Sequence, residues 1–312
     1  MKLIESSVTL LQQEEGLRGI EKQIELAGRT CYKSEDKITE ASSVDFVKKM
    51  IASGHTAMLE HGTVYLDFGW LPWDGTTYKL VSKYIRNKYS KVCGPIYENV
   101  QYKEGERQYS KCFVTTNLRV LQENGWLNDL KYICEPTEYH EKRISLKFIT
   151  DRGVSHEIVR HRVFSFAQES TRYCNYSKDK FGNEITYIIP SWSDIPEGTY
   201  KTLAQVTPVV KGVKNRLFFN QLTAVQDAYN ILIEEGCTPQ EARQVLPNAL
   251  KTEIVVTGFV SDWRHFFDLR LLGTTGKPHP DMLLLAQKAK KVLEENNLWE
   301  LIYPKDEKVS NN

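Results

Sequence analysis

The densest group of polar residues lies in the middle of the chain. Three of them are consecutive, Arg160, His161 and Arg162, and a second polar run occupies residues 168–172. Arginine forks bind phosphate and carboxylate groups through paired hydrogen bonds, so this segment is a candidate anion site. An isolated Arg-His-Arg triplet is more often the solvated C-terminal end of a helix, where the helix dipole favours cations. The triplet alone therefore favours the simpler interpretation.

The spacing of the whole segment is more informative than the triplet. It reads RHRVFSFAQESTRY from Arg160 to Tyr173, which is Arg-His-Arg, seven residues and then Ser-x-Arg. This arrangement resembles the signature of the flavin-dependent thymidylate synthases. Upstream, GHTAMLEHGTVYLDF resembles the family segment in which two histidines precede a strand, and His55 and His61 match those two.

Two downstream segments extend the resemblance. EARQVLP contains Arg243 followed by Leu-Pro, and DWRHFFDLR ends in Arg270, which matches the family arginine placed against the uracil ring. The four segments occur in the family order and cover most of 1–68 and 143–295. Because they are far apart in the chain, no single segment contains a complete site, and in the family the site forms at the interfaces of a homotetramer.

The resemblance implies the reductive methylation of dUMP to dTMP. Methylenetetrahydrofolate would supply the carbon, and FAD reduced by NADPH would supply the hydride. Thymidylate synthases that work without flavin use a cysteine nucleophile in a Pro-Cys-His context, which none of the six cysteines here has. No Gly-x-Gly-x-x-Gly follows a predicted strand, so FAD is expected to be held by side chains at subunit interfaces and not by a Rossmann-type site.

The resemblance also assigns roles to individual residues. Arg270 would act catalytically by stabilising negative charge on the uracil, with His55 or His61 beside the flavin and the folate. The expected dUMP-binding residues are Glu157, Arg160, Gln168, Glu169, Ser170, Thr171, Arg172, Arg243 and Arg270. The expected FAD-binding residues are Thr63, Arg160, His161, Arg162, Gln168, His265 and His279. No metal ion is expected.

Several positions depart from the family pattern. Many members have Asn at the position of Phe259 and Arg at that of Ser261, where both contact the flavin. The loop TTGKPHPDM, which contains His279, is longer than in most members. Residues 69–142 have no counterpart in the shortest members, and we interpret them as an insertion.

Three other functions deserve comparison with this one. The sequence HEIVRH places His156 and His161 five positions apart, whereas a metalloprotease helix needs a separation of four to align both rings. The segment 78–91 is locally basic and aromatic, which is compatible with nucleic-acid binding, but an amphipathic, solvated helix explains it more simply. A catalytically impaired flavoprotein of the same fold is suggested by Phe259 and Ser261, and the retained arginines argue against it.

The composition is that of an ordinary globular protein. Of the 312 residues, 41% are hydrophobic and 26% are charged, as is typical of such proteins. The net charge of +1 argues against nucleic acid as the main partner. The six cysteines form no C-x-x-C pair, which favours reduced thiols. With no signal-peptide pattern and no apolar run of bilayer length, the protein is expected in the cytoplasm without a membrane partner.

Hydrophobic periodicity predicts helices packed against a small sheet. Strands are expected at 62–68 and 143–150, paired with each other in an antiparallel or mixed sheet, and 162–190 is expected to be irregular. The expected helices are 17–30, 43–53, 117–124, 154–161, 214–235, 239–246, 261–272 and 281–296. The helix at 214–235 has an expected core-facing side formed by Leu217, Phe218, Leu222, Val225, Tyr229 and Leu232. The predicted fold class is mixed α/β. Residues 1–312 are expected to form a single domain, with an insertion at 69–142 and a disordered tail at 305–312.

Overall fold

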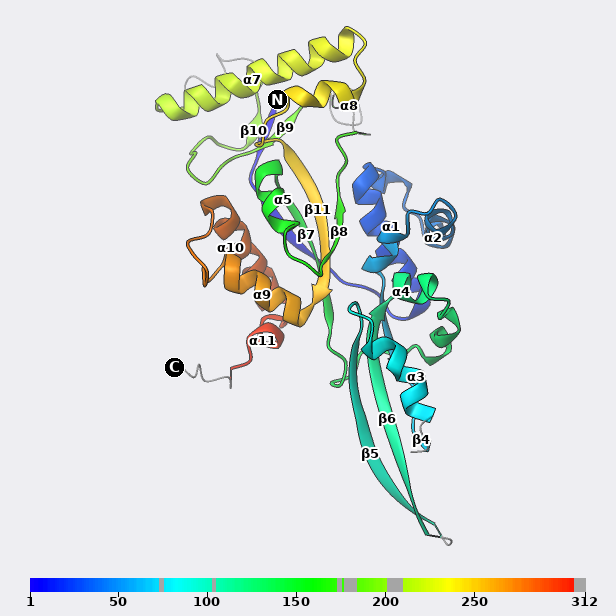
Figure 1. Ribbon diagram of the computed structural model, residues 1–312. Coiled ribbons are helices and arrows are strands. Elements are labelled where there is room, and N and C mark those ends of the chain that lie inside the picture. The colour runs from blue at the N-terminus through cyan, green and yellow to red at the C-terminus, as the bar shows by residue number, and fades with distance from the viewer. Residues whose placement is uncertain (73–75, 103–104, 173–175, 177–183, 201–209, 306–312) are drawn as a thin grey trace.

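The computed structural model describes residues 1–72, 76–102, 105–172, 176, 184–200 and 210–305. Within these ranges, the centre of the molecule is an antiparallel sheet of four strands in the order β2, β7, β11, β8 (Figure 1). The strands are β2 (Ser7–Leu11), β7 (Arg143–Asp151), β11 (Lys251–Phe259) and β8 (Ser165–Gln168). Antiparallel sheets packed against helices confirm the predicted mixed α/β class.

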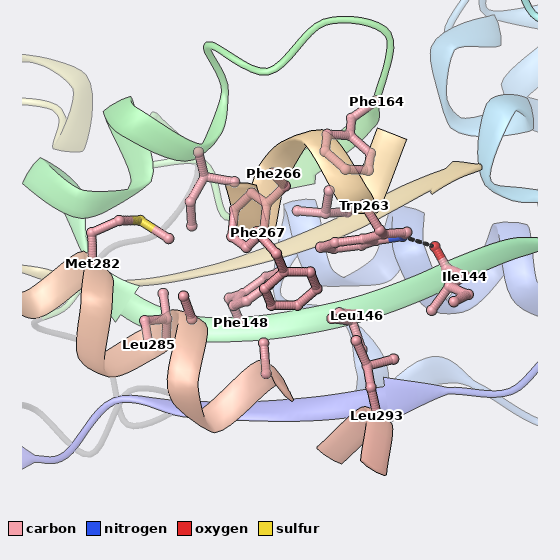
Figure 2. Packing of buried hydrophobic residues seen from close by; sticks show 14 of the residues in the cluster. Ile144, Leu146, Phe148, Phe164, Trp263, Phe266, Phe267, Met282, Leu285 and Leu293 are labelled. Atoms are coloured by element: carbon pink, nitrogen blue, oxygen red, sulfur yellow. Dashed lines mark hydrogen bonds between the residues drawn. The ribbon is translucent and has the colours of Figure 1, made fainter. Parts of the chain in front are cut away.

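One face of the central sheet forms the main hydrophobic core. Alternate residues of β7, including Ile144 and Phe148, point toward this face, as the two-residue period of a strand requires. Trp263 packs over them and its Nε1 donates a hydrogen bond to the Ile144 carbonyl at 3.1 Å, as Figure 2 shows. The helices on this face are α5 (Arg152–Ile158), α9 (Val260–Arg270), α10 (Pro280–Glu295) and α11 (Trp299–Ile302).

The opposite face of the sheet is more polar. It is covered in part by α1 (Gly16–Tyr32), whose Ala27 packs on Val255 in a small apolar cluster. Buried polar side chains surround this cluster, among them Ser145 and Thr257. Next to α1 lie η1 (Glu35–Lys37), α2 (Ser42–Ala52) and η2 (Thr56–His61).

A second sheet contains most of the 69–142 segment. Its strands are β3 (Thr63–Asp67), β4 (Leu71–Pro72), β5 (Lys91–Tyr102) and β6 (Gly105–Asn117), and α3 (Thr76–Ile85), α4 (Leu118–Glu123) and η3 (Leu127–Tyr132) accompany them. β5 and β6 form a long ribbon that extends away from the body in Figure 1. The predicted pairing of 62–68 with 143–150 is wrong, because β3 pairs with β6 whereas β7 pairs with β2 and β11.

A third sheet lies at the other end of the molecule. It comprises β10 (Gly198–Thr199), β1 (Lys2–Ile4) and β9 (Thr186–Ile188), and it is covered by α7 (Val213–Glu234), α8 (Pro239–Ala242) and η5 (Arg243–Val245). α7 packs inward through Phe219, Leu222 and Tyr229. The prediction that Leu217 faces the core is wrong, since this side chain is 65% exposed.

Most predicted helices are confirmed within a few residues, and the amphipathic helix expected within 78–91 is α3. The helix predicted at 239–246 begins as α8, and at its start the Thr238 amide donates to Glu241 Oε2 at 2.8 Å. The prediction of irregular structure over 162–190 is wrong for β8 and β9. Residues 173–175, 177–183 and 306–312, which include most of the predicted tail, lie outside the described residues. No helix among those described is both long and apolar enough to cross a membrane.

Candidate functional site

Helix α5 connects the core to the Arg-His-Arg triplet. Asp151 caps its start by accepting a hydrogen bond from the Val154 amide at 2.8 Å. The helix ends at Ile158, and Arg160–Arg162 follow in the turns that lead to β8. The predicted helix to residue 161 is therefore too long, and the triplet lies on irregular backbone where its three side chains point to different environments.

His161 is the buried member of the triplet. It is 4% exposed, its Nδ1 lies 3.0 Å from the Ile158 carbonyl, and its Nε2 accepts a hydrogen bond from Arg270 Nε at 3.3 Å. Burial lowers the pKa of His161, which favours the neutral ring that can accept from a guanidinium. Because both ring nitrogens already have partners, a metal ion at His161 would have to displace Arg270.

Arg270 is fixed at the C-terminal end of α9. Its Nη1 lies 2.6 Å from Glu157 Oε2, and its Nη2 donates to the Glu157 carbonyl at 3.3 Å. The two side chains are 19% and 29% exposed, so the pair is close to the surface and accessible to a ligand. The structure thus brings three predicted residues, Glu157, His161 and Arg270, into one hydrogen-bonded group.

The two arginines of the triplet extend outward from this group. Arg160 and Arg162 are exposed and have no hydrogen bond or ion pair with the rest of the described chain. His265 is also exposed, and its ring centroid lies 6.2 Å from that of His161. Two guanidinium groups and an imidazole next to a neutral buried histidine form a donor set that suits a diphosphate. The residues present therefore fit the expected FAD.

A second group of predicted residues lies at the N-terminal end of α5. Gln168, at the end of β8, donates through Nε2 to Ser155 Oγ of α5 at 2.8 Å. Beyond it, Thr171 Oγ1 accepts from Arg243 Nη1 at 3.1 Å, and Arg172 is exposed. The Ser170 amide donates to the Cys31 carbonyl at 3.0 Å, which holds this segment against α1.

Glu169 belongs to a network of buried charged residues that was not predicted from the sequence. It is 3% exposed and its Oε2 lies 2.9 Å from Lys251 Nζ. Lys251 also contacts Glu253, which has Lys33 and Lys147 as further partners. Burial alone would raise the pKa of Glu253, but the three lysines hold it well below its ordinary value. The sequence feature that could have indicated this network is the pair of charged residues Lys251 and Glu253, at the start of the apolar strand KTEIVV.

The two predicted histidines upstream lie in different environments. His61 is fully buried, with Nδ1 2.9 Å from Thr257 Oγ1, and burial lowers its pKa to about 3. His55 is exposed, and its Nδ1 lies 3.1 Å from the Tyr32 hydroxyl. In one protomer, therefore, His55 is the histidine that a ligand can reach directly.

Thr63 is linked to a residue that the sequence did not indicate. Its Oγ1 accepts from Arg143 Nη1 at 3.2 Å, and the same guanidinium donates to the Glu60 carbonyl and to Ser165 Oγ. Burial lowers the pKa of Arg143 to about 10. Arg143 therefore connects η2 and β3 to the start of β8, which carries the Arg-His-Arg signature into the sheet.

The departures from the family pattern have a structural explanation. The Phe259 ring is buried, with the Arg143 guanidinium 5.5 Å and Lys91 Nζ 5.6 Å from its centroid. The Ser261 amide donates to Glu141 Oε1 at 3.1 Å. Phe259, at the end of β11, thus contacts β7 and β5, and Ser261 of α9 contacts the segment before β7.

His279 lies apart from the other predicted residues but borders the Arg270 group. It caps α10 by accepting from the Asp281 amide at 3.3 Å. A cavity of about 310 Å³ lies between it and Glu157, and Trp192 and Asn248 also line this cavity. His279 and Glu157, the partner of Arg270, therefore line the same cavity.

Comparison with known proteins identifies relatives of this chain. The family model described as thymidylate synthase complementing protein matches residues 136–296. The flavin-dependent thymidylate synthase of Geobacter sulfurreducens is 34% identical over 119 residues, 38% of this chain and 43% of that protein. That of Corynebacterium aurimucosum is 25% identical over 286 residues, 91% of this chain and 80% of that protein. That of Corynebacterium diphtheriae is 30% identical over 46% of this chain and 54% of that protein. In two of these three relatives, the chain spans only about half of the relative's length.

Solved structures are matched more weakly. The chain is similar to a UMP/dUMP methylase, PolB from Streptomyces cacaoi, bound with 5-Br dUMP, at 14% identity over 96% of each chain with a TM-score of 0.42. A TM-score this low does not establish a shared fold, and the family assignment depends on the sequence matches alone.

Proposed function

The chain belongs to the thymidylate synthase complementing protein family, and from this we propose that it is a flavin-dependent thymidylate synthase. Its substrate would be dUMP, its product dTMP, and its cofactor FAD. Methylenetetrahydrofolate and NADPH would be the co-substrates. The proposal extends to the whole chain what the matched relatives are named for.

One observation in the structure carries this proposal furthest. Helix α5 separates two groups of cations, with Arg160 and Arg162 beyond its C-terminal end and Arg172 and Arg243 near its N-terminal end. Seven helical residues span about 10 Å, so two anionic ligands can bind on either side of one rigid element. A flavin dinucleotide and a nucleoside monophosphate are two such ligands.

The two groups divide the binding roles. Arg172 and Arg243 would bind the dUMP phosphate, assisted by Ser170, Thr171 and the backbone of the adjoining segment. Gln168 and Glu169 are already bonded to Ser155 and Lys251, respectively, so they would mainly hold that segment in place. At the other end of the helix, the FAD contacts would come from Arg160, Arg162, His161 and His265, with Thr63 and His279 reaching the cofactor from their separate positions.

Arg270 would act on the nucleotide base. When bound and reduced by NADPH, the flavin would supply the hydride that converts the transferred methylene group to methyl. Glu157 and His161 orient the Arg270 guanidinium, and a neutral His161 places no second positive charge beside it. A guanidinium held in this way stabilises negative charge on the uracil without having to reorganise during the reaction. His55, the accessible upstream histidine, would lie beside the flavin and the folate.

The assembly would be a homotetramer. In one protomer the predicted residues form separate groups: the two ends of α5, the α1 and η2 side, and the start of α10. Subunit contacts would combine these groups into complete sites, as the family resemblance implies.

The visible absorption spectrum of the purified protein tests the proposal. With added FAD, flavin bands are expected to remain after desalting, and to bleach faster with NADPH in the absence of oxygen when dUMP is present. Retained flavin that bleaches but yields no dTMP would identify the impaired flavoprotein. A protein that retains no flavin and does not bind dUMP would contradict the proposal.

A further inference from the structure

The outer face of α7 carries an apolar stripe that the protomer leaves exposed. Val213 is 64%, Leu217 65% and Ile231 56% exposed, and Ala224 between them is exposed as well. These positions recur at intervals of whole helical turns and therefore form one line along the helix. They lie opposite the buried side of α7, and Figure 1 shows the helix at the outer end of the molecule, beyond the third sheet.

The charged residues of α7 occur in the opposite order to the one that the helix dipole favours. Its two cations, Lys214 and Arg216, lie near the N-terminus, and its two carboxylates, Asp227 and Glu234, lie toward the C-terminus. All four are exposed. In an isolated helix, cations are favoured at the C-terminus and anions at the N-terminus. The opposite order is unfavourable with respect to the dipole, and an external partner that presents complementary charges at each end would offset this cost.

A second α7 running in the opposite direction presents those charges. We propose that α7 pairs antiparallel with the α7 of a second copy of this chain, around a two-fold axis near the middle of the helix. Val213 of each copy then lies beside Ile231 of the other, and Ala224, near the axis, allows the backbones to approach closely.

The register that places Val213 beside Ile231 also pairs the charges. Arg216 lies three positions after Val213, and Asp227 lies four positions before Ile231, so the two are at nearly the same height in opposite helices. At 100° per residue, Arg216, Asp227 and Glu234 fall on the same flank of the stripe. A two-fold axis perpendicular to the helices brings identical flanks together, so Arg216 of each copy faces Asp227 of the other.

The self-complementary pattern selects a second copy as the occupant. An isologous interface requires one patch to complement itself, and the stripe together with its flanking charges does so only in the antiparallel arrangement. A polyanionic partner is disfavoured, because it would lie against the two carboxylates of α7 as well as its two cations. The inference rests on the proposed homotetramer and describes one of its interfaces. A tetramer with two-fold symmetry has at least one other kind of interface. Loss of the α7 interface should therefore leave dimers.

Charge reversal and its rescue test the pairing on the full chain. Light scattering after size exclusion is expected to show half the wild-type mass for Arg216→Glu and for Asp227→Arg. The double variant should recover the wild-type mass, because the reversed pair is again complementary. Within one helix the two side chains are eleven positions apart, too far to rescue each other. Lys48→Glu on α2, whose side chain is 73% exposed, is the matched control and should leave the mass unchanged.

Leu217→Asp provides a second, independent disruption of the stripe. Circular dichroism spectra that match the wild type would show that each variant folds. A monomeric wild type, an unchanged mass in both single variants, or a double variant that remains dissociated would overturn the inference. Flavin retention and dUMP binding are measured on the same samples, so a failure of the proposed function is distinguished from a failure of the pairing.

Discussion

The sequence identified Arg270 as a candidate site residue but did not identify the residues that it contacts. Its place in DWRHFFDLR made it a candidate, but its partners His161 and Glu157 are 109 and 113 positions away in the chain. Spacing along the sequence predicts neighbours on one helix and not across the fold. The contacts of Arg143 with Thr63 and Ser165 were missed for the same reason, since no motif contains this arginine.

At the residue scale, Arg172→Ala tests the nucleotide site. Removing a charge-assisted hydrogen bond costs about 1.5 to 3 kcal/mol, which corresponds to a loss of about 10- to 150-fold in dUMP affinity. Isothermal titration with dUMP measures it. The exposed position of Arg172 predicts an unchanged thermal midpoint, and Arg86→Ala, another exposed arginine, should retain full affinity. Wild-type dUMP affinity in Arg172→Ala would remove this residue from the site.

At the element scale, the sequence predicted helices better than strands. Amphipathic helices such as α1 and α10 have one buried stripe, which periodicity detects. β11 was missed because nearly all of its residues are buried, so the alternation that indicates a half-buried strand is absent. The partners of β3 and β7 were predicted incorrectly because alternation identifies a strand but not its neighbour.

His61 links elements, and its burial predicts a pH dependence of stability. It bonds to Thr257 of β11 from the end of η2, and burial lowers its pKa from the ordinary value of 6.5 to about 3 in the folded state. Between these values only the unfolded chain binds the proton, so the contribution of His61 is complete above pH 6.5 and is lost as the pH falls. The slope is about 1.4 kcal/mol per pH unit.

Urea unfolding of wild type and His61→Gln at several pH values isolates this effect. The difference in unfolding free energy between the two proteins should shrink steadily as the pH is lowered from 6.5 toward 4. His161 and His140, whose pKa values are also lowered by burial, are common to both proteins and cancel in the difference. A difference that does not vary with pH would show that His61 is not buried as a neutral ring.

A substitution at Gly258 tests how tightly β11 packs against the signature segment. A Cβ at this position would lie 2.1 Å from the ring of Phe164, which packs on Trp263 with centroids 4.6 Å apart. Gly258→Ala should therefore lower the unfolding free energy by about 1 to 3 kcal/mol and weaken flavin retention, because Phe164 lies between the signature residues Arg162 and Ser165. In Gly198→Ala the nearest atom is 3.4 Å away, and stability should be unchanged. Equal thermal midpoints for both variants would contradict this packing.

At the scale of the whole molecule, the described residues of the site form several groups on different elements. The two ends of α5, the α1 side of the sheet and the α10 start are fixed by three separate hydrophobic cores. The sequence predicted the members of these groups through the family resemblance. It could not predict how subunits combine them, because an interface depends on which surfaces remain exposed after folding, such as the Leu217 side of α7.

The most direct test of the proposed function is the formation of dTMP from dUMP. The purified chain is incubated with methylenetetrahydrofolate, NADPH and FAD, and the nucleotides are separated by chromatography. We predict dTMP formation that requires FAD and falls at least tenfold in Arg172→Ala at subsaturating dUMP, in line with the expected loss of affinity. Formation of dTMP that is independent of flavin, or no dTMP from a folded protein that holds both FAD and dUMP, would contradict the proposed activity.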